Sequence, residues 1–274
     1  MLAMATGILV GAALGLTGGG GSIFAVPLLV YVVGVTIRDA VQVSLAAVAG
    51  AAAFGAVVAW RGGLVEWRAG LIFVLGGSLA APVGVKLGQA SAEEVTTTAF
   101  AGLMVFVASL MWRRSRRDPA GARVVRADVD ATAAGGAHPV CELNADNLLV
   151  LTAPCGLMLA ATGLITGFLS GFLGVGGGFI IVPALSLVTQ MSIQRAVATS
   201  LFVISLIGSS ALASGWWAGI DLPFPLTANF LVGSIAGMVM GRTLAERLAG
   251  ESLQRFFSGA IAAVGVVMLV TLII

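Results

Sequence analysis

The chain of 274 residues is much more apolar than a soluble domain, with 59% hydrophobic residues, 9% charged residues and a mean hydropathy of +1.08. Soluble domains carry about 25% charged residues, so this composition excludes a soluble protein and predicts an integral membrane protein in contact with lipid. The net charge is only +2, and nothing in the sequence indicates nucleic acid as a partner.

Apolar stretches of about 20 residues predict the membrane-spanning segments, because a helix of that length crosses a bilayer. They cover residues 2–34, 40–60, 69–87 and 95–112 in the first half of the chain, and residues 148–188, 196–217, 225–244 and 256–274 in the second. The runs are continuous and do not alternate with a period of two, so the spans are helical. The predicted fold class is an all-α polytopic membrane protein.

The segment between the two groups of spans is polar. Residues 113–147 carry six arginines, several acids, glycine and proline, and they have no sustained apolar period. This composition predicts a solvated loop.

The two halves repeat each other at an offset of 156 residues. This offset aligns GLTGGGGSIFAVP at residues 15–27 with GFLGVGGGFIIVP at residues 171–183, including the glycine clusters and the final proline. The same offset pairs residues of matching type, namely Ser44 with Ser200, Trp60 with Trp216, and Lys86 with Arg242. We therefore predict two homologous repeats, residues 1–112 and 148–274, each with one glycine-broken segment and three transmembrane helices.

The glycine clusters predict a break in the backbone at matching places in the two halves. Glycine costs about 1 kcal/mol relative to alanine inside a helix, and non-helical backbone at membrane depth must be buried in protein or line a cavity. Matched breaks of this kind indicate a transport site. Helices that begin near Ser22 and Gly178 would direct N–H groups and their positive dipole ends toward that site, which favours an anion. Glycines that only allow close helix packing are the alternative interpretation.

The basic residues favour inverted repeats. With the loop at 113–147 in the cytoplasm, an inverted second repeat places 12 of the 14 basic residues on the cytoplasmic side and leaves only Arg38 and Lys86 outside. Parallel repeats would place 8 inside and 6 outside. We therefore predict that each broken segment is a hairpin or crosses the membrane twice, and that both termini face outward.

The sequence resembles the sulfite exporter TauE/SafE family, also known as the four-toluene sulfonate uptake permease family. The resemblance rests on GLTGGGGSIFAVP near the start, GFLSGFLGVGGGFIIVP past the middle and MSIQRAVATS directly after it, and it covers essentially the whole chain. It implies a secondary transporter in the bacterial inner membrane that moves small sulfur-containing anions such as sulfite or organosulfonates. The first motif has Ser22 where the second has Gly178, so the two half-sites need not be chemically equal.

The candidate substrate-binding groups lie in and just after the two breaks, because a compact oxyanion needs several N–H and O–H donors. They are Thr17, Gly18, Gly20, Gly21, Ser22, Gln42 and Ser44 in the first half, and Gly174, Gly176, Gly177, Gly178, Thr199 and Ser200 in the second. Serine and threonine in membrane helices more often bond to nearby backbone or to a neighbouring helix, which is the alternative for each hydroxyl.

The candidate charge partners of the anion are Arg38, Asp39, Arg195, Lys86 and Arg242. Charges at the ends of spans are more simply solvated or turned toward the membrane interface. No titratable group lies at a depth typical of a proton relay. The sequence therefore does not identify the coupling ion, for which a proton and a sodium ion are the candidates. The sequence does not define the oligomeric state.

Other classes of protein fit the sequence less well. The first motif lacks the GK[ST] ending of a P-loop, and no cluster of histidine, cysteine and acids indicates a metal or an intramembrane active site. We therefore predict no enzyme activity and no cofactor. An anion channel and a membrane subunit of a larger transport complex are the alternatives, and two discrete breaks favour alternating access over the continuous polar stripe of a channel.

Overall fold

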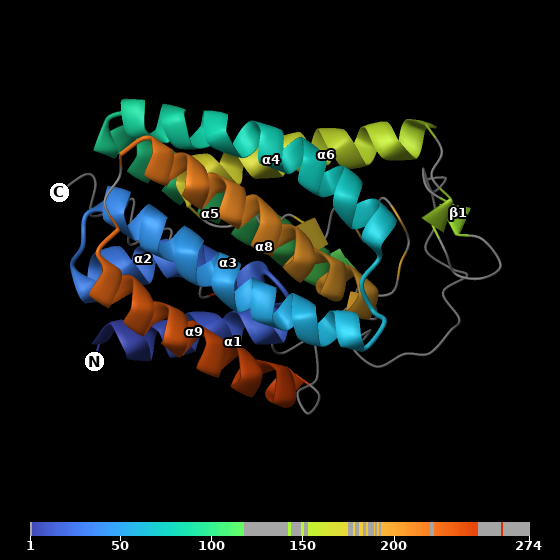
Figure 1. Cartoon of the computed structure of the whole chain (residues 1–274), viewed down its shortest axis with the longest axis horizontal. Coiled ribbons are helices and arrows are strands. Elements are labelled where there is room, and N and C mark those ends of the chain that lie inside the picture. The colour runs from blue at the N-terminus through green and yellow to red at the C-terminus, as the bar shows by residue number, and fades with distance from the viewer. Residues whose placement is uncertain are drawn as a thin grey trace.

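A computed structural model describes residues 2–117, 142–143, 149–150, 153–174, 193–219 and 222–245, together with positions 178, 181, 182, 185, 189, 191 and 259. Its helices form one elongated bundle (Figure 1). The first half contains α1 (Leu2–Thr17), a 3₁₀ turn (Gly20–Phe24), α2 (Ala25–Leu28), a π-helical turn (Leu29–Val33), α3 (Ile37–Arg61), α4 (Trp67–Ala90) and α5 (Glu93–Arg117). The second contains β1 (Glu142–Leu143), β2 (Leu149–Val150), α6 (Ala153–Leu173), α8 (Ile193–Trp217) and α9 (Phe224–Ala245).

Five of the described helices are long and apolar enough to cross a membrane, namely α3, α4, α6, α8 and α9. They confirm the spans predicted in these parts of the sequence. The predicted span at 95–112 lies within α5. The predicted span at 256–274 falls outside the described residues, apart from position 259.

The structure differs from the prediction on both sides of the central polar segment. Helix α5 continues to Arg117, past the predicted end at residue 112, because arginine is a good helix former and the helix can run on into water. Strands β1 and β2 pair antiparallel, with Glu142 opposite Val150 and Leu143 opposite Leu149. The sequence predicts an irregular loop at Glu142–Leu143 and the start of an apolar stretch at Leu149–Val150, so this short β-ladder was predicted in neither place.

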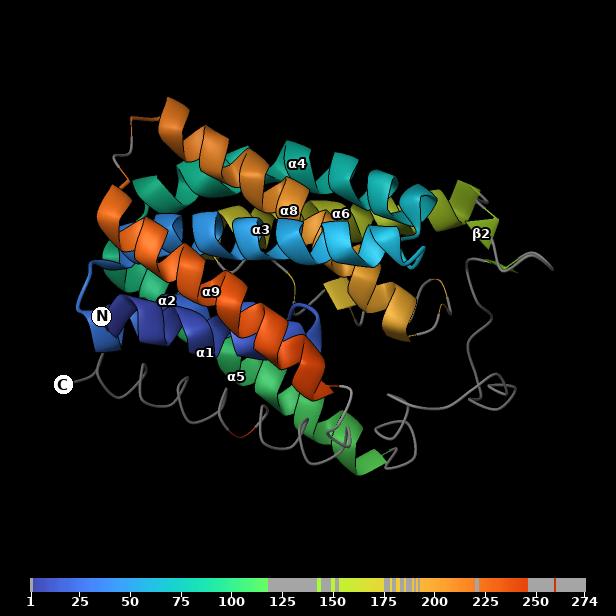
Figure 2. The same cartoon turned by 60° about the horizontal axis from the view of Figure 1, so that its bottom comes forward.

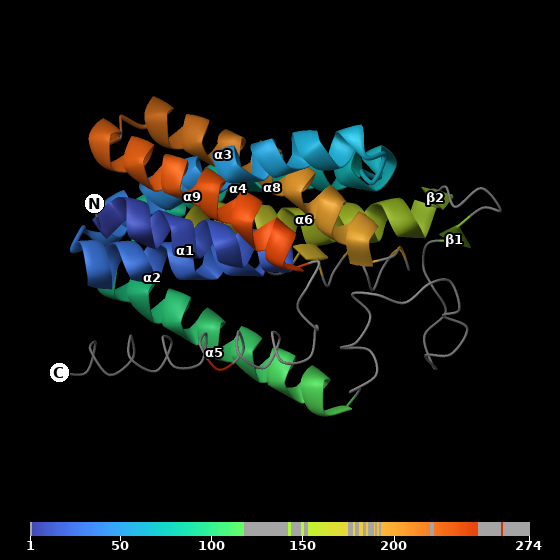
Figure 3. The ribbon, with the colours of Figure 1, turned by 90° about the horizontal axis from the view of Figure 1, so that it is seen from below.

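The first glycine cluster turns the chain back along α1. Helix α1 ends at Thr17, and the backbone then adopts positive φ angles of 70° at Gly18 and 156° at Gly19. Gly21 packs directly on the backbone of α1, where a Cβ would overlap Ala13. Helix α2 lies beside α1 (Figure 3), so α3 begins at the same end of the bundle as the N-terminus (Figure 1).

The centre of the bundle is made by α3 and α8. In each of them 61% of the membrane-length window is buried, against 33–44% for α4, α6 and α9. The two helices run antiparallel, because Gly208 packs on Ala49 while Gly215, further along α8, packs on Gln42, which lies earlier on α3. These two helices, one from each half, therefore occupy the middle of the core.

Each outer pair joins a helix of one half to a helix of the other through glycine. In α1, Gly7, Gly11 and Gly15 face the backbone oxygens of Phe230, Ser234 and Met238 in α9; in α6, Gly163, Gly167 and Gly171 face those of Phe73, Gly77 and Ala81 in α4. The contacts advance in the same direction along both helices, so each pair is parallel, as Figure 2 shows for α1 and α9. Small residues let two helix backbones approach closely without lipid between them.

We expect Gly167→Ala to destabilise the protein by about 1–2 kcal/mol. A Cβ at this position would overlap the carbonyl oxygen of Gly77, and overpacking typically costs about 1–3 kcal/mol, partly offset by the better helix propensity of alanine. The thermal midpoint in detergent measures the loss. The control is Gly156→Ala on the same helix, where the nearest atom would be 4.0 Å from the new Cβ. An equal fall for both variants would contradict the close backbone contact.

Candidate functional site

Gly18 and Gly174, which begin the two glycine breaks, have the same local geometry. Gly18 and Gly174 both follow the end of a helix, and their φ angles are +70° and +71°. In both cases the N–H of the glycine donates to a carbonyl four residues earlier, that of Leu14 at 2.7 Å and that of Ser170 at 2.9 Å. A left-handed residue of this kind ends a helix, and glycine adopts it without steric cost.

Each break is held by a serine of the opposite half. The Ser200 hydroxyl donates to the carbonyl oxygen of Gly18 at 2.6 Å, and the Ser44 hydroxyl donates to that of Gly174 at 2.7 Å. Both serines are fully buried. The pairs are related by the offset of 156 residues that relates the two halves of the sequence, so the same contact is made twice, each time between halves.

Valine side chains and the backbone fill the remaining space at the breaks. A Cβ on Gly18 would overlap Val197, and a Cβ on Gly174 would lie 2.7 Å from the Cα of Val41. Gly19 meets Gly178, and a Cβ on Gly19 would lie 2.7 Å from the Gly178 carbonyl oxygen. The two predicted breaks are therefore brought together in the core. Gly176 and Gly177 lie outside the described residues.

The other candidate hydroxyls are also bonded to backbone. Thr17 donates to the carbonyl of Ala13 at 2.7 Å and accepts from the N–H of Gly21 at 3.0 Å, which ties the end of α1 to the turn. Ser22 donates to the carbonyl of Gly19 at 2.8 Å. Thr199 accepts from the N–H of Glu66 at 3.0 Å. These hydroxyls shape the breaks and the ends of helices, which agrees with the alternative interpretation of them.

Gln42 lines a hollow of about 310 Å³ between α3, α4, α5 and α6. The hollow is lined by Ile37, Arg38, Val41, Gln42, Val85, Gly88, Gln89, Thr96, Gly171 and Phe172. Gln42 is only 3% exposed, and its Oε1 has no hydrogen-bond partner; the buried Nε2 of Gln89 also has none. Gly171 and Phe172 lie in the last turn of α6, directly before the second break, so the hollow lies beside that break.

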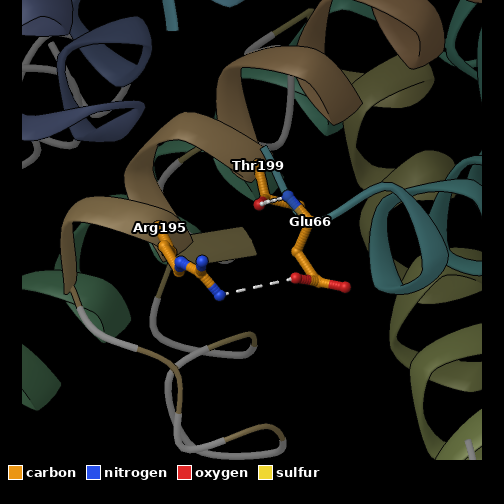
Figure 4. Close-up of polar contacts among 3 residues, drawn as sticks. All are labelled: Glu66, Arg195 and Thr199. Carbon is orange, nitrogen blue, oxygen red and sulfur yellow. Dashed lines mark hydrogen bonds and ion pairs between the residues drawn. The ribbon is translucent and has the colours of Figure 1, made fainter. Parts of the chain in front are cut away.

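Two of the predicted charge partners have structural roles. Asp39 belongs to the start of α3, where the Thr36 hydroxyl donates to its carboxylate at 2.8 Å and accepts from its N–H at 3.3 Å. Arg195 pairs with Glu66 at 3.8 Å, and Glu66 is 9% exposed (Figure 4). The pair joins the start of α4 in the first half to the start of α8 in the second. Glu66 is not among the charge partners predicted from the sequence.

Lys86 and Arg242 do not occupy equivalent positions in the two halves. Equivalent glycine contacts relate Phe73 to Phe230, Gly77 to Ser234 and Ala81 to Met238, which is an offset of 157 residues and not 156. The connection before α9 is therefore one residue longer than the connection before α4, and the partner of Arg242 is Val85. Both charged residues are exposed, and Arg242 lines a separate hollow of about 190 Å³ with Phe54 and Met238.

These features define a multi-pass helical membrane protein whose two halves meet at paired glycine breaks. The sulfite exporter TauE/SafE family matches residues 3–268, so the chain belongs to this family of membrane transporters, and the resemblance noted in the sequence is confirmed. The chain is 34% identical to a probable membrane transporter protein of Xylella fastidiosa strain 9a5c, over 97% of this chain and 93% of that protein. It is 24% identical to the probable membrane transporter protein YjnA of Bacillus subtilis, over 94% and 95%. No solved structure matches the chain.

Proposed function

We propose that the protein is a secondary transporter that moves small sulfur-containing anions, such as sulfite or organosulfonates, across the bacterial inner membrane by alternating access. The observation that carries this proposal is the contact of Gly19 with Gly178 in the core, with each break held by a serine of the opposite half. Substrate sites of secondary transporters lie where two repeats meet at discontinuous helices. The family name supports the substrate class.

The arrangement of the helices supports inverted repeats. Helix α3 corresponds to α8 by sequence, and the two run antiparallel through the centre (Figure 1). Helices α1 and α6 also correspond, and they too run in opposite directions (Figure 1). Two halves related in this way share a two-fold axis in the membrane plane. Together with the arginine distribution, this favours the loop at 113–147 in the cytoplasm, both termini outside, and each broken segment as a hairpin that enters and leaves on one side.

Under this proposal other peptide N–H groups of the breaks supply donors for the anion, because those of Gly18, Gly21 and Gly174 already donate to oxygen atoms in α1 and α6. The Ser44 and Ser200 hydroxyls donate to carbonyls, so their hydrogens are already used. Each hydroxyl joins a break to the central helix of the opposite half, so a movement of one half against the other acts directly on these two bonds. Such rocking of one repeat against the other around a fixed site is the usual form of alternating access.

We expect proteoliposomes that contain the protein to take up at least one sulfur oxyanion with saturable kinetics. The panel is sulfite, sulfate, thiosulfate, taurine and sulfoacetate, with acetate and chloride as comparison anions, and radiolabelled or chromatographic detection. Imposed proton and sodium gradients then identify the coupling ion. Transport of carboxylates alone would overturn the substrate class, and a non-saturating electrical current would favour the anion channel.

A further inference from the structure

We propose that the hollow beside Gln42 is a binding site for a small oxyanion, with Arg38 as its cation and the amides of Gln42 and Gln89 as its polar contacts. The proposal rests on the anion transport inferred above and assigns one site to it. It places the charge that holds the substrate beside the second break, at the start of α3.

The size and lining of the hollow fit a small anion. Its volume of about 310 Å³ lies at the lower end of the range for small-molecule sites, enough for a compact oxyanion with some water. Among the described residues that line it, Arg38 is the one that carries a charge, and this charge is positive. Arg38 and Gln42 stand four residues apart on α3 and share one face of the helix.

The glutamines supply the observation that points to a ligand. Gln42 is almost fully buried in a membrane-spanning helix, yet its Oε1 has no partner, and the buried Nε2 of Gln89 has none either. Buried polar groups are nearly always hydrogen-bonded. The two orphaned atoms are explained if the anion accepts a hydrogen bond from the Nε2 of Gln89 while a bound water donates to the Oε1 of Gln42, since an amide oxygen only accepts.

Gly215 of α8 leaves the space that the Gln42 amide occupies. A Cβ on Gly215 would lie 2.5 Å from Oε1 and 3.0 Å from Nε2 of Gln42, so any larger residue there must push the amide. Val41, next to Gln42, lines the hollow and also packs on Gly174. Helix α8 and the second break therefore both contact residues of α3 that line the proposed site.

The opposite end of the core lacks these groups. At the offset of 156 residues, Arg38 corresponds to Gln194 and Gln42 to Ala198. Ala198 packs in a small apolar cluster with Ala59 and Val65. Among the described residues the site is therefore present once, on the side where α3 begins, which the arginine distribution places outside.

Affinity and stability of purified variants test the site. With sulfite and methanesulfonate as probes, we expect Arg38→Gln and Gln42→Leu each to raise the Kd measured by calorimetry at least tenfold. Gln42→Leu should leave the thermal midpoint of the unliganded protein unchanged or higher, because it removes an unpaired buried polar atom. A purely structural glutamine would give a lower midpoint instead. Gly215→Ala should weaken binding without removing any polar group.

The matched control is Arg61→Gln, which removes an exposed arginine at the other end of α3 and should leave the Kd unchanged. If Arg38→Gln and Gln42→Leu both bind the probes with the wild-type Kd, the proposed binding site is wrong. The proposed transport function is unaffected by that result. If the wild-type protein binds neither probe, the proposed binding site is also wrong. Measurements of flux in proteoliposomes then test the transport function separately. Binding that the variants lose, in a protein that transports no oxyanion, supports the site and overturns the transport function.

Discussion

Gly18→Val is expected to lower the stability of the folded protein by about 2–5 kcal/mol and to abolish transport. The φ angle of +70° is left-handed, a conformation that costs an L-residue about 1–2 kcal/mol. A Cβ would also overlap the side chain of Val197 in the core, and overpacking adds about 1–3 kcal/mol or more for a branched side chain. Thermal unfolding in detergent and size-exclusion chromatography measure the loss of folded protein.

Three further variants separate the two causes. Gly34 has a φ angle of +81°, and a Cβ added there would meet no atom within 4 Å, so Gly34→Ala measures backbone strain alone. Gly18→Ala adds the contact with Val197, and Val197→Ala in that background should recover part of the loss. Gly174→Ala should behave like Gly18→Ala, because Val41 stands in the place of Val197. Equal stability of Gly18→Ala and Gly34→Ala would show that the break is not tightly packed.

The sequence predicts the spans and the breaks well because both depend on local properties. Long apolar runs form helices in lipid whatever they pack against, and a glycine cluster interrupts a helix wherever it lies. The exchange of partners between halves was not predictable, because a repeat shows which residues correspond but not which faces meet. The contact of α1 with α9 depends on where Gly7, Gly11 and Gly15 find a matching surface.

The location of the candidate site is easier to predict from the sequence than its chemistry. Gly19 of the first break contacts Gly178 of the second. The hydroxyls of Ser44, Ser200 and Ser22, however, donate to glycine carbonyls in the breaks. Such partners depend on the tertiary fold. Gln89 and Thr96, which line the hollow, stand near the ends of spans, where a polar residue is ordinary and carries no signal in one sequence. The extra residue before α9 also could not be detected, because the two halves were aligned at a single offset without a gap.

The ion pair of Glu66 and Arg195 is expected to control opening at the end of the bundle opposite the hollow. It links the halves at 3.8 Å, beside the hydrogen bond from Glu66 N–H to Thr199, and Trp67 packs on Phe202 next to it with ring centroids 4.8 Å apart. Alternating access requires these contacts to separate when this end opens. Removing these contacts therefore shifts the equilibrium toward the open state by the free energy that they contribute to the closed state.

We expect Arg195→Gln to lower stability by about 2–3 kcal/mol, because it leaves the Glu66 carboxylate buried without its cation. Loss of one partner from a buried pair typically costs about 3–5 kcal/mol, and the figure is reduced here because the Arg195 side chain is 34% exposed. Glu66→Gln removes the buried charge itself and should cost much less. The double variant should therefore be more stable than Arg195→Gln alone, which a double-mutant cycle of thermal midpoints measures.

The same variants separate a gate from a purely structural contact. If opening at this end limits transport, Glu66→Gln raises the rate of substrate exchange in proteoliposomes, although its folded state is no more stable than that of the wild type. Arg68→Gln is the control, since Arg68 is exposed and lies two residues from Glu66 along the chain. An unchanged exchange rate in Glu66→Gln, or the same change in Arg68→Gln, would mean that the pair only fixes the start of α4 against α8.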